Sequence, residues 1–264
     1  MKLGFIGCGN MASAMMKGII SNGIIEAKDI VGADVFAPSR EKAKENLGIT
    51  VTESNSEVVK QSDIFVLSIK PQFYEKVIAE IKGDVTENQI VVTLAPGKTL
   101  AWLSEQFGKE VKIVRTMPNT PAMVLEGMTA ACPNAHVSEE DLEKVLRILS
   151  AFGDVEVVPE KLMDAVVAVS GSSPAYVFMM VEAMADAAVA EGMPRAQAYK
   201  FAAKAVMGSA KMVLETGKQP GELKDMVCSP GGTTIEAVKV LEATGFRSSL
   251  MEAMEACAEK SRSL

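Results

Sequence analysis

The first half of the chain alternates short apolar runs with segments of mixed polarity. Apolar runs predict strands at residues 2–6, 30–35, 63–69, 90–94 and 112–116. The run at 63–69 is apolar on both faces, which is typical of a parallel strand covered on both sides. Helices are predicted at residues 10–22, 40–47 and 100–107. Strands separated by helices indicate βαβ units in a doubly wound α/β sheet.

The same alternation continues beyond these elements. Two further strands are predicted at residues 128–132 and 155–158. Ser138 opens the helix between them. Asp141 follows it at capping-box spacing, with Asp in place of the usual Glu or Gln.

The second half of the chain is predicted to be entirely helical, because no segment after Glu160 has the character of a strand. We therefore expect an N-terminal domain at residues 1–159 and an all-helical domain at residues 160–264. Ser173 and Pro174 combine an N-cap with proline at the first helical position. Glycines and prolines delimit the end of that helix and the helices after it, at Gly192, Pro194, Gly217 and Pro220.

The first helix of this second half is apolar almost all round. Glu182 and Asp186 are its only charged residues between positions 175 and 190, so every side of it must be covered. A domain of ~100 residues does not easily enclose such a helix alone. Intertwining with a second subunit would cover it, and so would a place at the centre of a monomeric bundle. Its longest uninterrupted apolar run, 175–181, is shorter than the ~20 residues of a membrane span, so no membrane partner is expected.

Charge and the start of the chain narrow the class of protein. The 264 residues include 27 basic and 34 acidic side chains, a formal net charge of −7. No basic cluster stands out, so we do not expect a nucleic-acid partner. Apolar residues typical of a folded core begin just after Met1, with no signal peptide before them, so a cytoplasmic location is expected.

Neither the cysteines nor the histidine suggest a metal site. The four cysteines have neither CxxC nor metal-ligand spacing, and we interpret them as reduced, mostly buried residues in preference to a redox role. His136 is the single histidine, and it is expected in a surface loop before Ser138. The cysteines are Cys8, Cys132, Cys228 and Cys257.

Residues 7–12 match the G-x-G-x-x-G/A fingerprint between the first strand and the first helix. Gly7 makes the tight turn, Gly9 lets a pyrophosphate approach the backbone, and the small residue at position 12 allows helix and strand to pack closely. Asn10 and Met11 lie where free N–H groups and the helix dipole hold phosphates. We expect a Rossmann-type dinucleotide-binding domain. The alternative is a glycine turn that holds no ligand.

Two groups of residues compete for the adenosine ribose. Asp34 ends the second predicted strand, where a carboxylate would hold the ribose 2′-hydroxyl of NAD and repel the 2′-phosphate of NADP. Ser39 and Arg40 follow closely and could hold that phosphate instead. The choice between the two cofactors stays open on the sequence.

A second glycine turn, residues 229–236, is the most informative stretch of the helical half. Thr233 and Glu236 have capping-box spacing, which predicts a helix start near Thr234. The glycines before it leave backbone N–H groups exposed, and with the helix start they form an anion site sized for a carboxylate. The alternative is an ordinary capped helix after a turn.

Several stretches together are more specific than the fingerprint alone, at residues 4–11, 66–71, 115–121, 169–176 and 223–234. With these motifs the chain resembles the pyrroline-5-carboxylate reductase family, close to its bacterial form, over essentially its whole length. Two departures bear on the choice of cofactor. The spacing across residues 32–40 differs, and Pro96 stands where alanine is more usual.

The resemblance implies where the ligands bind. NADPH or NADH, with NADPH favoured, would lie across the first glycine loop and near Ala95. Asn55, Lys70 and Pro71 would lie near the adenosine and the pyrophosphate, and Asn119 near the nicotinamide end. The substrate carboxylate would be held by the backbone of the second glycine turn, at Ser229, Gly231, Gly232 and Thr233.

The resemblance also implies the reaction. Hydride would pass from the nicotinamide C4 to C5 of Δ1-pyrroline-5-carboxylate and give L-proline, the last step of proline biosynthesis. A protonated imine is already a good electrophile, so orientation and exclusion of water are the main tasks. The Thr234 hydroxyl would hydrogen-bond the substrate nitrogen and relay its proton. The pocket would lie between the Rossmann domain of one subunit and helices of a homodimer.

Two other functions fit the same two-domain plan. One is a related imine or β-hydroxyacid reductase. The β-hydroxyacid enzymes usually employ a catalytic lysine in the region where residues 170–176 offer serines and a proline. The other is a non-enzymatic NAD(P)H sensor, which has no need of a site for a small carboxylate. The reductase of a cyclic imine is therefore the preferred hypothesis.

Overall fold

The chain forms two compact units, and the computed structural model describes residues 1–263 of it. One unit comprises Met1–Ser172 together with the chain from Cys257, and the other comprises Ser173–Ala256. The domain boundary predicted at Glu160 was placed where the strands end along the sequence. It is a different kind of boundary from the division into compact units, and it stays a prediction.

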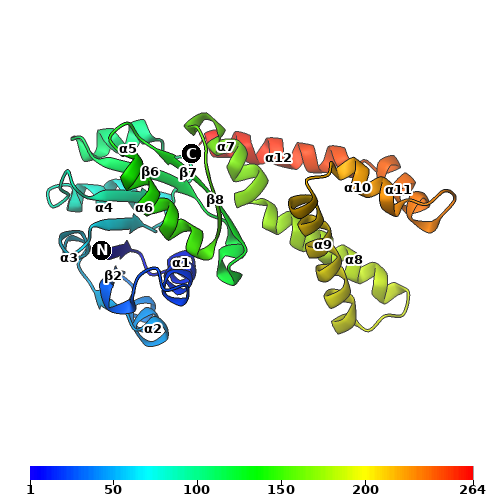
Figure 1. Ribbon diagram of the computed structural model, residues 1–264, viewed down its shortest axis with the longest axis horizontal. Coiled ribbons are helices and arrows are strands. Elements are labelled where there is room, and N and C mark those ends of the chain that lie inside the picture. The colour runs from blue at the N-terminus through cyan, green and yellow to red at the C-terminus, as the bar shows by residue number, and fades with distance from the viewer. Residues whose placement is uncertain (264) are drawn as a thin grey trace. The chain divides into compact units, whose positions relative to one another are not determined.

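An eight-stranded sheet forms the centre of the first unit, in the order β3-β2-β1-β4-β5-β6-β7-β8 (Figure 1). Strands β1 to β6 run parallel, β7 is antiparallel to β6, and β8 is parallel to β7. The predicted doubly wound α/β sheet is therefore confirmed. The strands are β1 Leu3–Ile6, β2 Ile30–Ala33, β3 Thr50–Thr52, β4 Ile64–Leu67, β5 Ile90–Thr93, β6 Lys112–Met117, β7 Gly127–Pro133 and β8 Gly153–Val157.

Helices cover both faces of this sheet (Figure 1). They are α1 Asn10–Ser21, α2 Ala37–Leu47, α3 Asn55–Gln61, α4 Tyr74–Ile81, α5 Leu100–Phe107 and α6 Glu139–Leu149. Short turns of 3-10 helix lie between the elements, at η1 Ala27–Asp29, η2 Pro71–Phe73, η3 Thr120–Val124, η4 Ser150–Phe152 and η5 Glu160–Leu162.

Alternation of side chains along each strand explains why both faces need helices. In β4, Ile64 and Val66 pack in a core with residues of α1 and α6, whereas Phe65 and Leu67 pack in a core with residues of α3, α4 and α5. All four side chains are buried. Burial of each contributes ~1.5–3 kcal/mol relative to exposure. The run that is apolar on both faces is therefore a central strand.

Some elements lie where none is predicted from the sequence. Strand β3 and helix α3 occupy stretches in which polar residues break the apolar period, so tertiary packing decides them. Helix α4 has its buried residues at regular helical spacing, at Tyr74, Val77, Ile78 and Ile81, and the prediction missed this pattern. Helix α2 begins at Ala37 instead of position 40, because Pro38 fits the first helical turn. Ser39 and Arg40 therefore lie near the start of this helix.

The second unit is built from helices throughout residues 173–256. Its elements are α8 Ser173–Ala190, α9 Arg195–Thr216, α10 Pro220–Val227, α11 Thr233–Ala243 and most of α12 Phe246–Arg262. Gly192 and Gly217 follow α8 and α9 with left-handed φ values of 93° and 64°. They end these helices as predicted.

The prediction that Ser173 caps a free helix start is wrong. Helical backbone is continuous from Glu160 to Ala190, through α7 Met163–Val166 and a π-helical turn, η6 Val167–Gly171. Ser172 N donates to the carbonyl of Val167, five residues back, at 2.8 Å. This wider turn lies directly before Pro174, which has no N–H for a regular helical bond.

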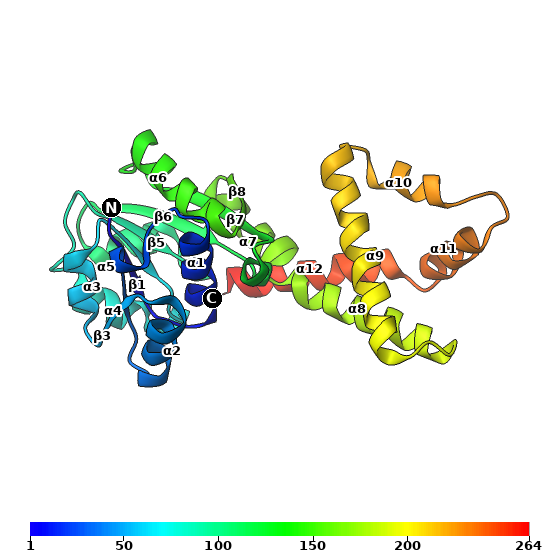
Figure 2. The same ribbon diagram turned by 60° about the horizontal axis from the view of Figure 1, so that its bottom comes forward.

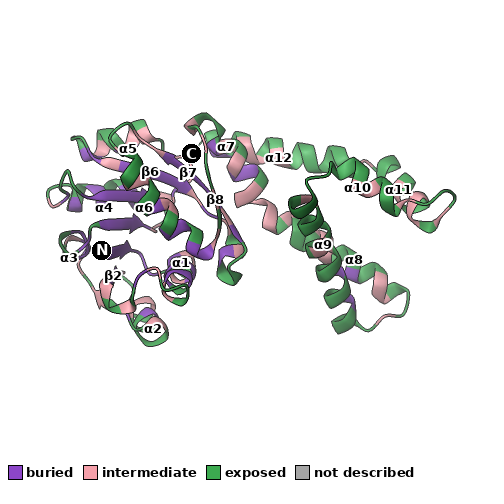
Figure 3. Cartoon of the chain, viewed as in Figure 1, coloured by how far each residue is buried: buried purple, intermediate pink, exposed green. Residues whose placement is uncertain are grey.

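Much of the apolar surface of the second unit is uncovered (Figure 3). In α8, Phe178 and Met179 are 63% and 69% exposed, and Ala185 is the buried residue. By length and composition alone, the helix from Glu160 to Ala190 is long and apolar enough to cross a membrane, a test that the core helix of a soluble protein also passes. The expectation of no membrane span stays a prediction. That prediction considered only the apolar run, whereas the helix extends back through η6, α7 and η5.

Candidate cofactor and substrate sites

Parallel strands bring several loops to one edge of the sheet. Strands β1, β4, β5 and β6 are neighbours with the same direction, so their carboxyl ends lie along one edge. The loops that follow them begin at Gly7, Ser68, Leu94 and Pro118. This edge is where open α/β sheets bind their ligands.

Hydrogen bonds fix these loops to one another. Ser68 Oγ donates to the carbonyl of Gly7 at 2.7 Å. The buried Tyr74 hydroxyl donates to Leu67 O at 2.6 Å and accepts from Leu94 N at 3.1 Å. Burial raises the pKa of Tyr74 above its usual value, so the phenol keeps the proton that it donates. These hydrogen bonds connect the loops that follow β1, β4 and β5.

The first glycine loop leaves room for a phosphate. Gly7 has a φ of 99°, and a Cβ there would lie 2.6 Å from Ser68 O, so the turn requires glycine. A Cβ at Gly9 would meet nothing within 4 Å, so this backbone faces open space. Gly9 caps α1 without a side-chain hydrogen bond, which leaves N–H groups of the first turn, around Asn10 and Met11, open to a ligand. A pyrophosphate fits this cradle.

A cavity of about 230 Å³ opens beside the loop. Its wall brings together Gly7, Asp34 and Asn55, three of the residues expected to bind cofactor. Apolar side chains supply much of the remaining wall, as an adenine ring requires. The other lining residues are Ile6, Ala33, Val35, Ile69, Phe73, Lys76, Val77 and Glu80.

Two charged residues of this wall escaped the sequence analysis. Lys76 and Glu80 lie on α4, a helix that was not predicted from the sequence. Asn55 Nδ2 donates to Glu80 Oε2 at 3.1 Å, so the glutamate orients a residue that the resemblance places near the adenosine. The signal that could have predicted α4 is its apolar spacing, at Tyr74, Val77, Ile78 and Ile81. Lys76 and Glu80 would then have been expected on one face of that helix.

Asp34 and Arg40 lie together beyond the end of β2. Asp34 Oδ2 accepts from Cys8 N at 2.8 Å, and Oδ1 accepts from Phe36 N at 2.9 Å. Arg40 Nη1 donates to Asp34 O at 2.6 Å, and Nη2 forms an ion pair with Glu53. Ser39, which was predicted with Arg40, is half-buried near the start of α2.

Asn119 follows β6 with both ends of its amide engaged. Its Oδ1 accepts from Met128 N at 2.9 Å, and its Nδ2 donates to Ser170 Oγ at 3.1 Å. Ser170 belongs to the π-helical turn η6, a kind of turn that is frequent at functional sites. The other residues expected near the cofactor are outside the wall of the cavity, namely Gly9, Asn10, Met11, Ser39, Arg40, Lys70, Pro71, Ala95 and Asn119.

The second glycine turn lies in the helical unit, between α10 and α11 (Figure 2). Gly231 has a φ of 68°, and Gly232 N donates to Ser229 O at 3.1 Å. Gly232 is the N-cap of α11 and has no side chain to offer. N–H groups of the first turn of α11 are therefore open, and an anion can bind there.

The capping box predicted from Thr233 and Glu236 is wrong. Thr233 is the first residue of α11 instead of its cap, because Gly232 takes the extended cap conformation with φ −81° and ψ 172°. Glu236 forms an ion pair with Lys239 at 3.1 Å. Throughout residues 1–263, the half-buried Thr234 has no hydrogen-bond partner for its hydroxyl. The missing cap leaves more donors for a ligand.

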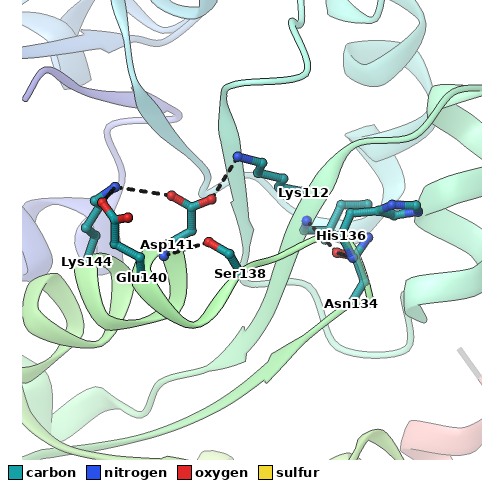
Figure 4. Close-up of polar contacts among 8 residues, drawn as sticks. Lys112, Asn134, His136, Ser138, Glu140, Asp141 and Lys144 are labelled. Carbon is teal, nitrogen blue, oxygen red and sulfur yellow. Dashed lines mark hydrogen bonds and ion pairs between the residues drawn. The ribbon is translucent and has the colours of Figure 1, made fainter.

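The polar cluster around Asp141 joins α6 to the start of β6, away from the carboxyl edge (Figure 4). Ser138 Oγ accepts from Asp141 N at 3.2 Å, which confirms the predicted cap. The Asp141 carboxylate pairs with Lys112 at 2.8 Å and Lys144 at 3.2 Å. The hydrogen bond from Lys112 is the main reason that the pKa of Asp141 lies below its usual value. His136 is exposed in the loop before the helix, as predicted.

The cysteines are all free thiols. Cys8 and Cys132 are buried, and burial raises the pKa of Cys8 to about 12. A thiol with that pKa is neutral near pH 7 and therefore a poor nucleophile. Over the part of the chain that the structure describes, no group of three or more His, Cys, Asp or Glu residues is placed to hold a metal ion.

Known protein families match both halves of the chain. The family model for pyrroline-5-carboxylate reductase dimerisation matches residues 160–264, and the model named NADP oxidoreductase coenzyme F420-dependent matches residues 2–97. A pyrroline-5-carboxylate reductase of Escherichia coli K12 is 54% identical over 266 residues, which cover 100% of this chain and 98% of that protein. One from Methanosarcina acetivorans is 44% identical over 263 residues, which cover 100% and 97%.

Solved structures show the same likeness along the whole chain. A pyrroline-5-carboxylate reductase from Coxiella burnetii is 34% identical with a TM-score of 0.91, over 99% of this chain and 97% of that one. A pyrroline carboxylate reductase from Plasmodium falciparum, solved with NADP bound, has the same identity, TM-score and coverage. The likeness therefore extends over both units.

Proposed function

The chain belongs to the pyrroline-5-carboxylate reductase family, and from that premise we propose that its two glycine loops bind the two reactants of one reduction. The activity is the NAD(P)H-dependent reduction of Δ1-pyrroline-5-carboxylate to L-proline, and the chain is an oxidoreductase. The observation that carries this conclusion is the 54% identity to the Escherichia coli enzyme across the full length of the chain.

The first glycine loop and the cavity beside it bind the cofactor in this proposal. Open space over Gly9 and the uncapped start of α1 suit the pyrophosphate. The cavity at Asp34 and Asn55 suits the adenosine. When bound, the reduced nicotinamide supplies the hydride, and this chain supplies its position. Asn119 and Ala95, which follow neighbouring strands at the same edge, are assigned to the nicotinamide half.

The second glycine turn binds the substrate in this proposal. Backbone N–H groups of Ser229, Gly231 and Thr233 hold the carboxylate beside Gly232, since the start of α11 has no side-chain cap to compete with it. The Thr234 hydroxyl accepts a hydrogen bond from the protonated ring nitrogen and holds the C=N bond toward the hydride. No stronger acid is needed, because the protonated imine already attracts hydride at C5.

A homodimer formed through the helical unit completes the proposal. The apolar side chains exposed on α8 require a cover, and the matching family model is a dimerisation domain. A second copy of the same unit offers the same apolar face in return. A cytoplasmic location stays a prediction, with which the four free cysteines agree.

The direct test is oxidation of NADPH, and separately of NADH, by the purified chain with Δ1-pyrroline-5-carboxylate as substrate. Loss of the absorbance of the reduced nicotinamide, with L-proline as product, is the expected result. A β-hydroxyacid substrate should give no turnover. No oxidation by folded protein that still binds cofactor would contradict the reaction while leaving the dinucleotide site in place.

A further inference from the structure

Arg40 is held between two acidic residues at the ribose end of the proposed cofactor site. Its side chain is only 13% exposed, and its Nη1 donates to the backbone carbonyl of Asp34. Its Nη2 pairs with the carboxylate of Glu53, whose side chain is 82% exposed. The guanidinium therefore has one partner that belongs to the fold and one that solvent could replace.

The local charge disfavours a phosphate. Asp34 and Glu53 carry one negative charge each against the single positive charge of Arg40, so the group is net negative. The hydrogen bonds to the Asp34 carboxylate come from the neutral backbone groups of Cys8 and Phe36, which leave its charge in place. A 2′-phosphate adds ~1.5–2 further negative charges. It would also need the guanidinium fork that Glu53 occupies.

We propose that Glu53 is a specificity-determining residue that lowers the affinity of this chain for the 2′-phosphate of NADPH. By occupying Arg40, it keeps the unphosphorylated cofactor NADH competitive. This inference rests on the proposed placement of the adenosine ribose beside Asp34. From the sequence, the choice between NADH and NADPH depends on Asp34 against Ser39 and Arg40. The structure adds Glu53, which determines how far the Arg40 guanidinium is available to a 2′-phosphate.

Glu53 is also the acidic residue that can be changed with least harm. Both oxygens of Asp34 accept backbone hydrogen bonds, one of them from the first glycine loop, so its replacement would alter the loop itself. Glu53 is exposed and pairs with Arg40 alone among the ion pairs of residues 1–263. Its replacement by glutamine removes the charge and keeps the size of the side chain.

The test compares Glu53→Gln with wild type by calorimetry, using 2′,5′-ADP and 5′-ADP as probes. We expect about five-fold tighter binding of 2′,5′-ADP, the scale of an exposed ion pair, with unchanged binding of 5′-ADP. The ratio of kcat/KM for NADPH over NADH should rise by the same factor. Glu57→Gln is the matched control, since Glu57 loses the same charge nearby but contacts the Thr52 hydroxyl instead of an arginine.

The double variant Arg40→Ala with Glu53→Gln should lose the gain, because the gain acts through Arg40. Unchanged or weaker binding of 2′,5′-ADP to Glu53→Gln would overturn the proposal, since Glu53 would then be neutral or would position Arg40 for phosphate. An equal gain in affinity for 2′,5′-ADP in Glu57→Gln would overturn it as well, because the effect would then come from the net charge of the region and not from the pair with Arg40. Failure of wild type to bind either probe, with imine reduction intact, would overturn the ribose placement and this inference but not the reaction.

Discussion

The two units of this chain differ in how far each covers its own apolar surface. In the first unit, central strands bury side chains on both faces, and their helices close both cores. In the second unit, Phe201 and Leu214 of α9 remain 67% and 80% exposed, and α8 has one buried residue. The first unit closes its own cores, whereas the second leaves apolar surface that the proposed homodimer would cover.

Buried ion pairs follow the same division, although the first unit also has exposed pairs such as Lys28 with Glu26. In the first unit, Arg115 and Glu160 pair at 2.8 Å with the arginine side chain almost fully buried, and Glu160 also accepts from Leu100 N at 2.7 Å. In the second unit the ion pairs, such as Lys239 with Glu236, are exposed. Exposed pairs contribute ~0–1 kcal/mol. Polar contacts therefore add specificity to the first unit and little to the second.

Gly9→Ala tests the cofactor site of the first unit and has the largest expected effect. A methyl group at Gly9 meets no protein atom within 4 Å, so folding stability should change by less than ~1 kcal/mol. The same methyl group occupies the space through which the pyrophosphate approaches, so cofactor affinity should fall by about 100-fold, or ~2.7 kcal/mol. Thermal unfolding and calorimetry with NADPH measure the two effects separately.

Gly83→Ala is the matched control, because a Cβ at Gly83 also meets nothing within 4 Å but lies far from the loop in the sequence. It should leave cofactor affinity unchanged. Equal affinity of the Gly9→Ala variant and wild type would remove the first glycine loop from the binding site.

The helical side of the comparison is tested by Met179→Asp. A charge placed in an interface core costs at least ~2 kcal/mol, equivalent to about 30-fold in the dissociation constant of the dimer. Light scattering should show a shift toward monomer at low concentration, together with a lower Tm. Val124→Asp in the first unit, where valine is 71% exposed, should leave the oligomer unchanged. A stable oligomer of the Met179→Asp variant would place the interface on another face.

Thr234→Ala tests the role of one hydroxyl group at the second glycine turn, in the helical unit. Loss of a hydrogen bond to the charged ring nitrogen should lower kcat by about 10- to 30-fold, or ~1.5–2 kcal/mol, and spare the affinity for NADPH. Thr234→Ser keeps the hydroxyl and should retain most of the activity. A kcat that does not change in Thr234→Ala would exclude this side chain from the mechanism.

The sequence predicts the first unit well because its signals are local. Continuous apolar runs specify the central strands, and the glycine spacing specifies the turn at Gly7. Helix α3 escapes prediction because it is only seven residues long and buries only two apolar side chains, Val58 and Val59. Helix α4 does carry the apolar spacing of an amphipathic helix, at Tyr74, Val77, Ile78 and Ile81, and was missed although that local signal is present. The residues that α4 adds to the cavity, Lys76 and Glu80, are missed with it.

Two errors in the helical half have a common physical origin. Ser173 and Thr233 are both good capping residues, yet neither caps a free helix start. A π-helical turn leads into Ser173, and the backbone of Gly232 takes the cap position before Thr233. Propensity identifies the residues that can cap a helix, while the path of the chain before the helix decides whether they do.

The smallest expected effect concerns the polar contacts of the first unit. Asp141→Asn removes a carboxylate that pairs with Lys112 and Lys144, so unfolding free energy at pH 7 should fall by ~1 kcal/mol, or a Tm shift of ~2–4 °C. The pKa of Asp141 is lowered in the folded chain, chiefly by Lys112, so its stabilisation is present above the unfolded pKa of ~3.9 and is lost as pH falls through the folded value. The two proteins should therefore unfold alike at the acid end of a pH series. Glu236→Gln in the second unit removes an exposed pair and should cost less than Asp141→Asn at pH 7. An equal loss in both variants would mean that the two units do not differ in how their ion pairs contribute.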